Sequence, residues 1–401
     1  MERGRLPGVS APEQIVCHAD MDCFYAACER LREPALRGEP VVVGMGYEPG
    51  TTNGAVATAS YEAREFGVES AQAISEALEL LPRKIDAARN GDSVAEAGFY
   101  RPVDMEYYES VAADVREILH EHAETVREVS IDEAYLDLTD RVDWADVEEF
   151  GRRLKATIES EVGVTASLGI APTMSAAKVA SDHDKPDGLV VVEPGEVRAF
   201  LADLPVEDVH GVGPVTAARM RELGIDAAGD LAAADPATLE SEFGERGRRV
   251  HRFARGEDER AVEPKGRPKS FSRESAFHEP TDDETAQYDR IERLATAVAQ
   301  RAERRDVLYQ TIGIKAVAPP FEVRTRARSL PGPVADEALL QEVAAELFGE
   351  FAGQRLRKVG VRVSNLSFGA DEQPSLSAFG GDDGEDPDPD GQRQRSLTEF
   401  E

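Results

Sequence analysis

The strongest constraint on the fold is an acidic pair, Asp20 and Asp22, placed where a predicted strand gives way to a predicted helix. A short apolar run, Ile15-Val16-Cys17, precedes the pair, and a helical pattern over residues 23–31 follows it. This order places Asp20 at the end of a strand, where its side chain can leave the sheet and face a cleft. Asp22 directly precedes the helix and is typical of an N-cap, which is a structural interpretation.

A second acidic stretch, Ser130-Ile131-Asp132-Glu133, lies between two strand-like runs and predicts the bend or start of a hairpin strand, with Asp137 in its solvated alternation. Adjacent carboxylates repel each other, so a fold that holds them beside Asp20 needs cations there. Hard oxygen ligands favour Mg²⁺, which takes its remaining ligands from water and substrate phosphates. Two such ions can activate an attacking oxygen and stabilise the leaving one. By spacing alone, however, a surface Asp-Glu pair is the more frequent explanation.

Four segments resemble, in order and separation, the motifs of Y-family DNA polymerases, and most closely those of the DNA polymerase IV (DinB) branch, which copies damaged templates. These segments are His18–Ala27, Ala57–Arg64, Ser130–Asp137 and Lys185–Gly188. The resemblance covers roughly residues 14 to 368. It implies that Asp20, Asp132 and Glu133 hold two Mg²⁺ ions, with the Met21 carbonyl as a further ligand, for DNA-directed DNA synthesis of low fidelity past damaged bases.

The resemblance also implies a multidomain α+β fold, a right-hand polymerase with palm, fingers, thumb and little finger. We expect these parts over the following residues: palm 15–23 and 101–192, fingers 24–100, helical thumb 193–262, linker 263–269, little finger 270–368 and a disordered acidic tail 369–401. The palm pattern predicts helices on one face of its sheet. Residues 270–368 predict the order β-α-β-β-α-β, a split βαβ unit.

Candidate nucleotide-binding residues follow the first acidic pair and recur in the fingers. Tyr25 lies on the first turn of the helix, and the resemblance makes it the steric gate that clashes with a ribose 2′-hydroxyl. Phe24 fits a core aromatic by its own pattern, and the resemblance places it beside the nucleotide, as it does Thr58. Tyr61 and Arg64 are three residues apart and share a helical face that suits a triphosphate.

Two lysines stand in the last part of the predicted palm. Lys185 lies in a loop before Pro186 and Gly188, where an ammonium group can reach the β- and γ-phosphates as a point charge. Without the motif, a plain loop lysine would be the simpler interpretation. Lys178 lies on a predicted helix over residues 173–183, and we expect it to contact solvent or backbone.

Two features predict contacts with primer-template DNA. The run Val209–Arg219 resembles a helix-hairpin-helix, whose Gly211 and Gly213 let backbone N–H groups approach a phosphate beside a helix N-terminus. An ordinary helix turn is the alternative. In the third strand of the little finger, Arg324, Arg326 and Arg328 alternate and point to one face. Like charges so close need an anion, which favours a phosphate-tracking ladder over a solvated edge strand.

The formal net charge of −32 is extreme for a nucleic-acid-binding protein, which is normally basic. Residues 264–328 nevertheless hold 13 Lys/Arg against 10 Asp/Glu, so basic charge is concentrated where DNA contacts are predicted. A cytosol at molar salt would reconcile these facts, because screening there limits the range of charge interactions to a few ångströms. We therefore hypothesise a halophilic host, and activity that collapses at molar KCl would contradict this.

The C-terminal segment ends in Gln394, Leu397 and Phe400, a spacing similar to that of sliding-clamp (PCNA) interacting peptides. One helical turn would place Leu397 and Phe400 in the same pocket. Glu401 stands where this motif usually has a second aromatic residue, which predicts weaker binding.

The remaining features are compatible with a cytoplasmic, monomeric enzyme that uses dNTPs. Cys17, Cys23 and Cys28 form no C-x-x-C pair and are interpreted as buried free thiols, and no stretch is long enough to span a membrane. Two rival functions remain. One is a non-catalytic scaffold that binds clamp and DNA, against which the intact carboxylate set argues. The other is a different two-metal palm enzyme, such as a nucleotide cyclase, which would not need the DNA-binding features.

Overall fold

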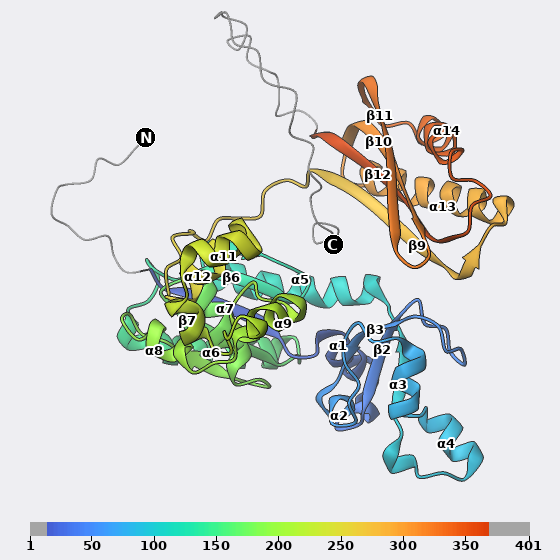
Figure 1. Ribbon diagram of the computed structural model, residues 1–401. Helices are drawn as coiled ribbons and strands as arrows, with labels where there is room; N and C mark the ends of the chain where they lie inside the picture. The colour runs from blue at the N-terminus through green and yellow to red at the C-terminus, as the bar shows by residue number, and fades with distance from the viewer. Residues whose placement is uncertain (1–13, 369–401) are drawn as a thin grey trace, which may run out of the picture. The chain divides into compact units, whose positions relative to one another are not determined.

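The computed structural model describes residues 14–368, and the chain divides into two compact units between Gly266 and Arg267 (Figure 1). Each unit has its own hydrophobic core. The candidate clamp-binding residues Gln394, Leu397 and Phe400 lie outside the described residues. None of the helices in the described range combines the length and hydrophobicity that crossing a bilayer requires.

The first unit is built on a five-stranded sheet in the order β5-β6-β1-β7-β8. The central strand β1 is antiparallel to both of its neighbours. The strands are β1 (Val16–Met21), β5 (Thr125–Glu128), β6 (Glu133–Asp137), β7 (Ala166–Ala171) and β8 (Leu189–Val191). Every residue of β1 is buried, because helices cover both faces of the sheet.

The two faces of β1 have different neighbours. Cys17, Ala19 and Met21 point into a core shared with α5 (Met105–His122) and α6 (Val147–Glu161). On the opposite face, Val16 joins a second core with α7 (Met174–His183). His18 and Asp20 alternate with Cys17 and Ala19, so they face α7 as well. Our expectation of helices on one face was therefore wrong, and the helix on the second face is the one that borders the acidic residues.

A three-stranded sheet and short helices make up the segment between β1 and α5. The sheet has the order β3-β2-β4, and α1 (Phe24–Arg32) connects it to β1. Its elements are β2 (Val41–Met45), β3 (Ala55–Ala59), α2 (Tyr61–Arg64), α3 (Ile74–Leu80), α4 (Lys84–Asn90) and β4 (Phe99–Pro102). The sequence interpretation included neither α4 nor β4. Both are short, and β4 pairs with β2 in parallel, an arrangement that a hairpin pattern in the sequence does not predict.

Five short helices follow the sheet and share a core with α7. They are α8 (Val197–Ala202), α9 (Pro214–Glu222), α10 (Ala228–Ala233), α11 (Pro236–Phe243) and α12 (Glu245–Ala254). Gly211 has a φ of +90° just before α9, and Gly244, at +60°, joins α11 to α12. These left-handed positions allow the sharp turns between short helices, because glycine adopts them without strain.

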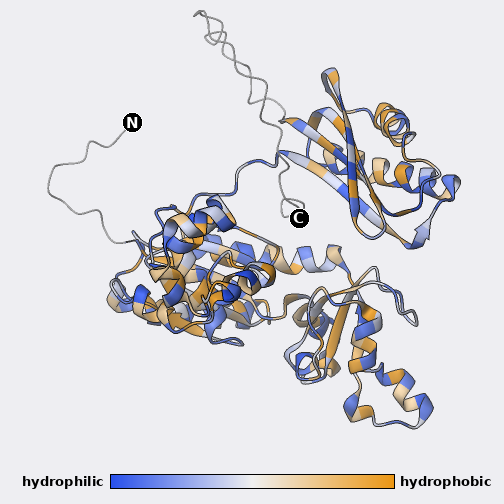
Figure 2. Cartoon of the chain, viewed as in Figure 1, coloured by the Kyte–Doolittle hydropathy of each residue, from blue (hydrophilic) through white to orange (hydrophobic). Residues whose placement is uncertain are grey.

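The second unit is a four-stranded antiparallel sheet in the order β11-β10-β12-β9, with two helices packed on it. The elements are β9 (Ser270–Thr281), α13 (Glu284–Glu303), β10 (Val307–Ala318), β11 (Glu322–Val334), α14 (Glu337–Phe348) and β12 (Leu356–Phe368). The predicted β-α-β-β-α-β order is confirmed. Figure 2 shows hydrophobic and hydrophilic residues alternating along these strands, as expected for a sheet with one buried face.

Candidate active site

Asp20 and Glu133 lie directly opposite each other on the neighbouring strands β1 and β6. The Asp132 carbonyl accepts a hydrogen bond from the Met21 N–H at 3.0 Å, so Asp132 and Met21 are also adjacent. The carboxylate of Asp132 accepts a hydrogen bond from the Ser130 hydroxyl at 2.6 Å. The strand register therefore brings the four predicted ligand residues to one end of two central strands.

Two lysines neutralise these carboxylates. The Lys178 ammonium group donates to Asp20 Oδ2 and to Glu133 Oε1, each at 2.7 Å. Lys185 Nζ lies 2.7 Å from Asp20 Oδ1 and 2.9 Å from Asp182. Our expectation that Lys178 contacts only solvent or backbone was wrong. Nothing in the local pattern around Lys178 indicated these contacts, which depend on the packing of α7 against the acidic strand.

Burial and the two lysines act in opposite directions on the carboxylates. Burial alone raises the pKa of Asp20, but Lys178 and Lys185 outweigh it and lower this pKa to about 2. Burial raises the pKa of Glu133, and Lys178 offsets this only in part. The pKa of Asp132 is raised by burial, with a contribution from nearby Asp20. The two lysines therefore compensate the negative charge of the three carboxylates only in part.

The donor atoms fit a divalent cation. One ring nitrogen of His18 and one carboxylate oxygen each of Asp20 and Glu133 all lie within 4.8 Å of one another. Ser181 Oγ donates to the Lys178 carbonyl, so His18 Nδ1, at 2.8 Å from Ser181 Oγ, is the donor in that contact. The lone pair of His18 Nε2 is then buried, with no hydrogen-bond partner among the described residues. The sequence interpretation missed His18.

Asp22 is structural, but it is no helix cap. Helix α1 begins at Phe24, and Cys23, with a φ of +46°, occupies the preceding position. The Asp22 carboxylate instead accepts hydrogen bonds from the Ser167 hydroxyl at 2.9 Å, from the Asp187 N–H at 2.8 Å and from the Tyr61 hydroxyl at 3.2 Å. Asp22 therefore connects the central sheet to the Lys185 loop and to helix α2, a role that its sequence position does not reveal.

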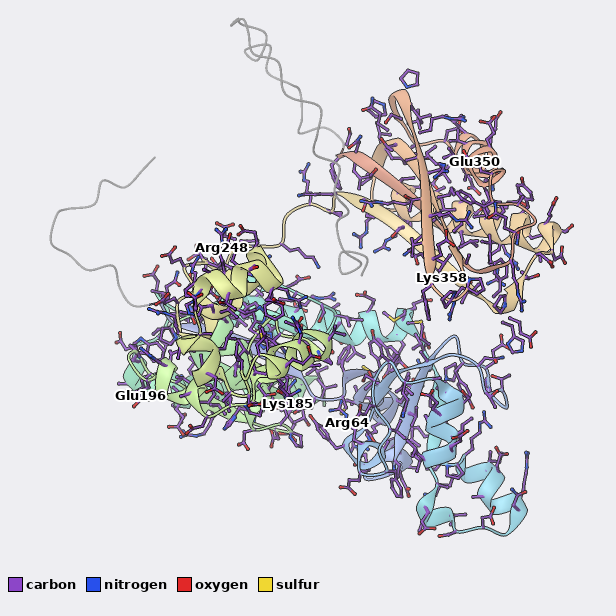
Figure 3. The ribbon with its side chains drawn as sticks, viewed as in Figure 1. Arg64, Lys185, Glu196, Arg248, Glu350 and Lys358 are labelled. Atoms are coloured by element: carbon purple, nitrogen blue, oxygen red, sulfur yellow. The ribbon has the colours of Figure 1, made fainter. Side chains whose placement is uncertain are left out.

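The candidate nucleotide-binding residues have different surroundings. Arg64 donates to the Ala59 carbonyl at 3.1 Å, and its guanidinium lies 4.8 Å from the ring centre of Tyr61; Figure 3 labels Arg64 and Lys185. Tyr25 stacks on Tyr108, with ring centres 4.7 Å apart. The other two candidates have different positions: Phe24 is buried in the core, with 1% of its surface exposed, and Thr58 is part of strand β3.

The candidate DNA-binding residues lie in both units. The Gly211 carbonyl accepts hydrogen bonds from Arg246 at 2.9 and 3.0 Å, and Gly213 directly precedes α9. In the second unit, each of the three arginines of β11 has an acidic neighbour. The pairs are Arg324 with Glu322 at 3.5 Å, Arg326 with Glu350 at 2.8 Å and Arg328 with Glu346 at 2.5 Å. Carboxylates of the same chain therefore neutralise these arginines here. Glu322 begins β11 itself, Glu346 lies on α14, and Glu350 follows the end of α14, a segment whose contact with β11 the sequence did not show.

Cys17, Cys23 and Cys28 are buried free thiols, which confirms the prediction for the three cysteines. Burial raises the pKa of each of these thiols. A raised pKa disfavours the reactive thiolate, so a structural role in the core is the consistent interpretation.

Family models match three parts of the chain: the impB/mucB/samB family over residues 19–182, its C-terminal domain over 268–377 and the IMS family HHH motif over 194–225. DNA polymerase IV of Halobacterium salinarum is 62% identical over 384 residues, which cover 94% of this chain and 92% of the relative. DNA polymerase IV of Methanoculleus marisnigri is 38% identical over 367 residues, with 91% and 98% covered.

Solved structures agree with the sequence relatives. A chimera of the Y-family DNA polymerases Dbh and Dpo4 superposes with a TM-score of 0.77 at 28% identity, covering 88% of this chain and 99% of that chain. DinB from Sulfolobus solfataricus gives a TM-score of 0.61 at 27% identity, with the same coverage. The fold is that of a DNA-directed DNA polymerase, a class whose Y-family members depend on metal ions, and the structure contains a cluster of acidic residues. The chain belongs to the Y family of DNA polymerases, in its DNA polymerase IV (DinB) branch.

Proposed function

We propose that the chain performs translesion synthesis by two-metal nucleotidyl transfer at Asp20, Asp132 and Glu133. The observation that carries this proposal is the register of β1 and β6, which holds Asp20 opposite Glu133 and Met21 beside Asp132. One solved relative is an insertion ternary complex of Dbh DNA polymerase, with a TM-score of 0.62, which supports DNA and dNTPs as substrates.

In this proposal, the three carboxylates and the Met21 carbonyl hold two Mg²⁺ ions. Bound Mg²⁺ would activate the primer 3′-hydroxyl and stabilise the charge on the departing pyrophosphate. The residues contribute by position, because two paired strands fix the separation of the carboxylates before substrate arrives. His18 is buried, and one of its ring nitrogens lies within 4.8 Å of an Asp20 and a Glu133 oxygen. Its Nε2 has no hydrogen-bond partner among the described residues, so it is available as a further ligand.

We infer that Tyr61, Arg64 and Lys185 bind the triphosphate. All three carry hydrogen-bond donors, and two of them are cations: the Tyr61 hydroxyl donates to Asp22, Arg64 donates to the Ala59 carbonyl, and Lys185 lies 2.7 Å from Asp20. A triphosphate would replace the present acceptors of these donors with phosphate oxygens. We assign Tyr25 to the steric gate beneath the sugar, with Phe24 and Thr58 as flanking contacts. The stacking of Tyr25 on buried Tyr108 supports a fixed ring position.

We propose that Gly211 and Gly213 contact duplex phosphates through the start of α9, and that Arg324, Arg326 and Arg328 follow the DNA backbone. For the arginines, phosphate groups would replace Glu322, Glu346 and Glu350 as partners. Figure 3 labels Glu350 on the second unit. Such contacts read no base sequence, as a polymerase requires.

We further propose that the chain is divided into palm (15–23 and 101–192), fingers (24–100), thumb (193–262), linker (263–269) and little finger (270–368). We also propose that an acidic tail recruits the sliding clamp through Gln394, Leu397 and Phe400. A monomer working in a cytoplasm at molar salt accounts best for the charge of −32, and the relative from Halobacterium salinarum supports a saline setting. If clamp binding is unchanged in Phe400→Ala, the recruitment proposal fails.

Primer extension in molar KCl with Mg²⁺, on an undamaged and an abasic template, tests the catalytic proposal. Asp132→Ala should lose at least about a hundredfold in rate, because metal ions contribute several kcal/mol to such transition states. Asp137→Asn is the matched control, since Asp137 is the last residue of β6, which begins directly after Asp132, and among the described residues its carboxylate accepts hydrogen bonds from Thr139 alone. This control should extend primers like the wild type.

The alternatives predict other results. Folded, DNA-bound wild-type protein that extends no primer would favour a non-catalytic scaffold bound to clamp and DNA. Extension that survives Asp132→Ala would refute the assignment of the metal site while leaving the polymerase activity in place. A nucleotide cyclase would consume nucleoside triphosphate without any primer-template.

A further inference from the structure

Lys178 occupies the position between the carboxylates where a cation is expected. Its ammonium group has three N–H donors, and all three are used: for Asp20 Oδ2, Glu133 Oε1 and Asp182. The side chain is 20% exposed, and that of Asp20 is 8% exposed, so little water reaches this contact. Among the described residues, Lys178 is the cation that the structure pairs with Glu133.

A metal ion and this ammonium group exclude each other. A divalent cation on Asp20 and Glu133 would need oxygens that now lie 2.7 Å from Lys178 Nζ. In such a poorly hydrated site, repulsion between a dication and an ammonium group at contact distance is large. The metal therefore binds only when the ammonium group leaves these oxygens.

The structure also provides a place for the displaced ammonium group. Asp182 lies one helical turn further along α7 and already contacts Lys178 at 3.2 Å. A polar pocket beside Lys178 is lined by Asp182, Glu207 and Asp208, among others. A rotation of the flexible lysine side chain would keep its charge compensated without moving α7.

We propose that Lys178 is an internal counter-ion that holds Asp20 and Glu133 together in the metal-free enzyme and is exchanged for the metal on binding. This inference rests on the proposed function of these carboxylates as metal ligands. It makes Lys178 a positioning residue that weakens metal binding in the free enzyme and stabilises the fold when metal is absent.

The test measures metal binding and not catalysis. Mn²⁺ is titrated into the DNA-free, full-length protein in molar KCl, and the free ion is followed by its electron paramagnetic resonance signal. Lys178→Met should bind at least about tenfold more tightly than the wild type, which corresponds to about 1.4 kcal/mol. The metal-free variant should also melt at a lower temperature and gain more from added Mn²⁺.

Two controls separate charge at the site from other effects. Lys358→Met removes the same charge from the second unit, where Lys358 (labelled in Figure 3) pairs with Glu274, and this variant should bind Mn²⁺ like the wild type. Lys178→Arg keeps the cation and should stay within about threefold of the wild type. If Lys178→Arg binds as tightly as Lys178→Met, packing and not charge is responsible, and the proposal fails.

The outcomes distinguish this inference from the proposed function. Asp20→Asn should abolish the tight Mn²⁺ site, and binding that survives this change would overturn the metal assignment and the inference together. Loss of binding in Asp20→Asn with unchanged affinity in Lys178→Met would overturn only the role of Lys178. If Lys178→Met does not fold without metal, folding that Mn²⁺ restores supports the proposal, and failure to fold with Mn²⁺ contradicts it.

Discussion

The close approach of α7 to the central sheet depends on the lack of a side chain at Gly169. A Cβ at this position would lie 2.1 Å from the Ala177 carbonyl oxygen and 2.2 Å from the Ser181 N–H nitrogen. Ordinary contact begins at 3.4 Å, so α7 would have to move by about 1.3 Å. Both obstacles are backbone atoms that cannot rotate away. We expect Gly169→Ala to cost about 3 kcal/mol of unfolding free energy, the upper end for overpacked cores.

Urea unfolding followed by tryptophan fluorescence measures this cost. Trp144 is the one tryptophan of the chain and packs against the core of the first unit, so its signal reports the unit that contains Gly169. Gly266→Ala is the control, because an added Cβ there meets nothing within 4 Å, and it should unfold within about 0.5 kcal/mol of the wild type. A Gly169→Ala protein as stable as this control would refute the packing argument.

Three further predictions concern other parts of the molecule. Burial, assisted by Arg260, lowers the pKa of His210 to about 4, whereas the unfolded chain has a His pKa of about 6.5. Because the unfolded chain therefore binds an extra proton, the free energy of unfolding should fall by about 3 kcal/mol from pH 6.5 to 4. A His210→Gln variant that keeps this pH dependence in urea titrations would contradict the prediction. Gln287 is fully buried, and all of its hydrogen bonds are to backbone groups. Gln287→Leu should destabilise the second unit by about 3 kcal/mol in calorimetry, with no change in the unfolding transition of the first unit that tryptophan fluorescence reports. Tyr61→Phe removes the hydrogen bond to Asp22 and should raise KM for the incoming nucleotide about tenfold at unchanged DNA affinity, and an unchanged KM would rule out a triphosphate contact.

The sequence predicted the elements whose patterns are local and strong. The strand-helix junction around Asp20 and the β-α-β-β-α-β order of the second unit follow from hydrophobic periodicity, and the structure confirms that order. The family resemblance implied that Asp20 and Glu133 share one site, but the antiparallel pairing that sets them opposite each other was not predicted, because nothing in either strand specifies its partner.

The errors share a physical cause, which is that a side chain meets partners from distant segments. Asp22 resembles a helix cap in sequence but receives its hydrogen bonds from residues more than 35 positions away. Lys178 resembles a solvent-exposed helix residue until α7 packs over Asp20. The sequence pattern alone gives the arginines of β11 no anionic partner, whereas in the fold Glu346 of α14 and Glu350, just after α14, supply carboxylates. Local periodicity contains no information on such contacts.

The position of β1 at the centre of the sheet has a consequence for synthesis on the ribosome. This strand is made first, yet its neighbours β6 and β7 begin only at Glu133 and Ala166. At about 5–20 residues per second, the nascent strand waits roughly six to thirty seconds for them. During that time its apolar residues are exposed, and Asp20 is the charge that discourages pairing with other chains. We therefore expect Asp20, which we assign to catalysis, also to limit aggregation of the nascent chain, so that Asp20→Asn lowers the soluble yield.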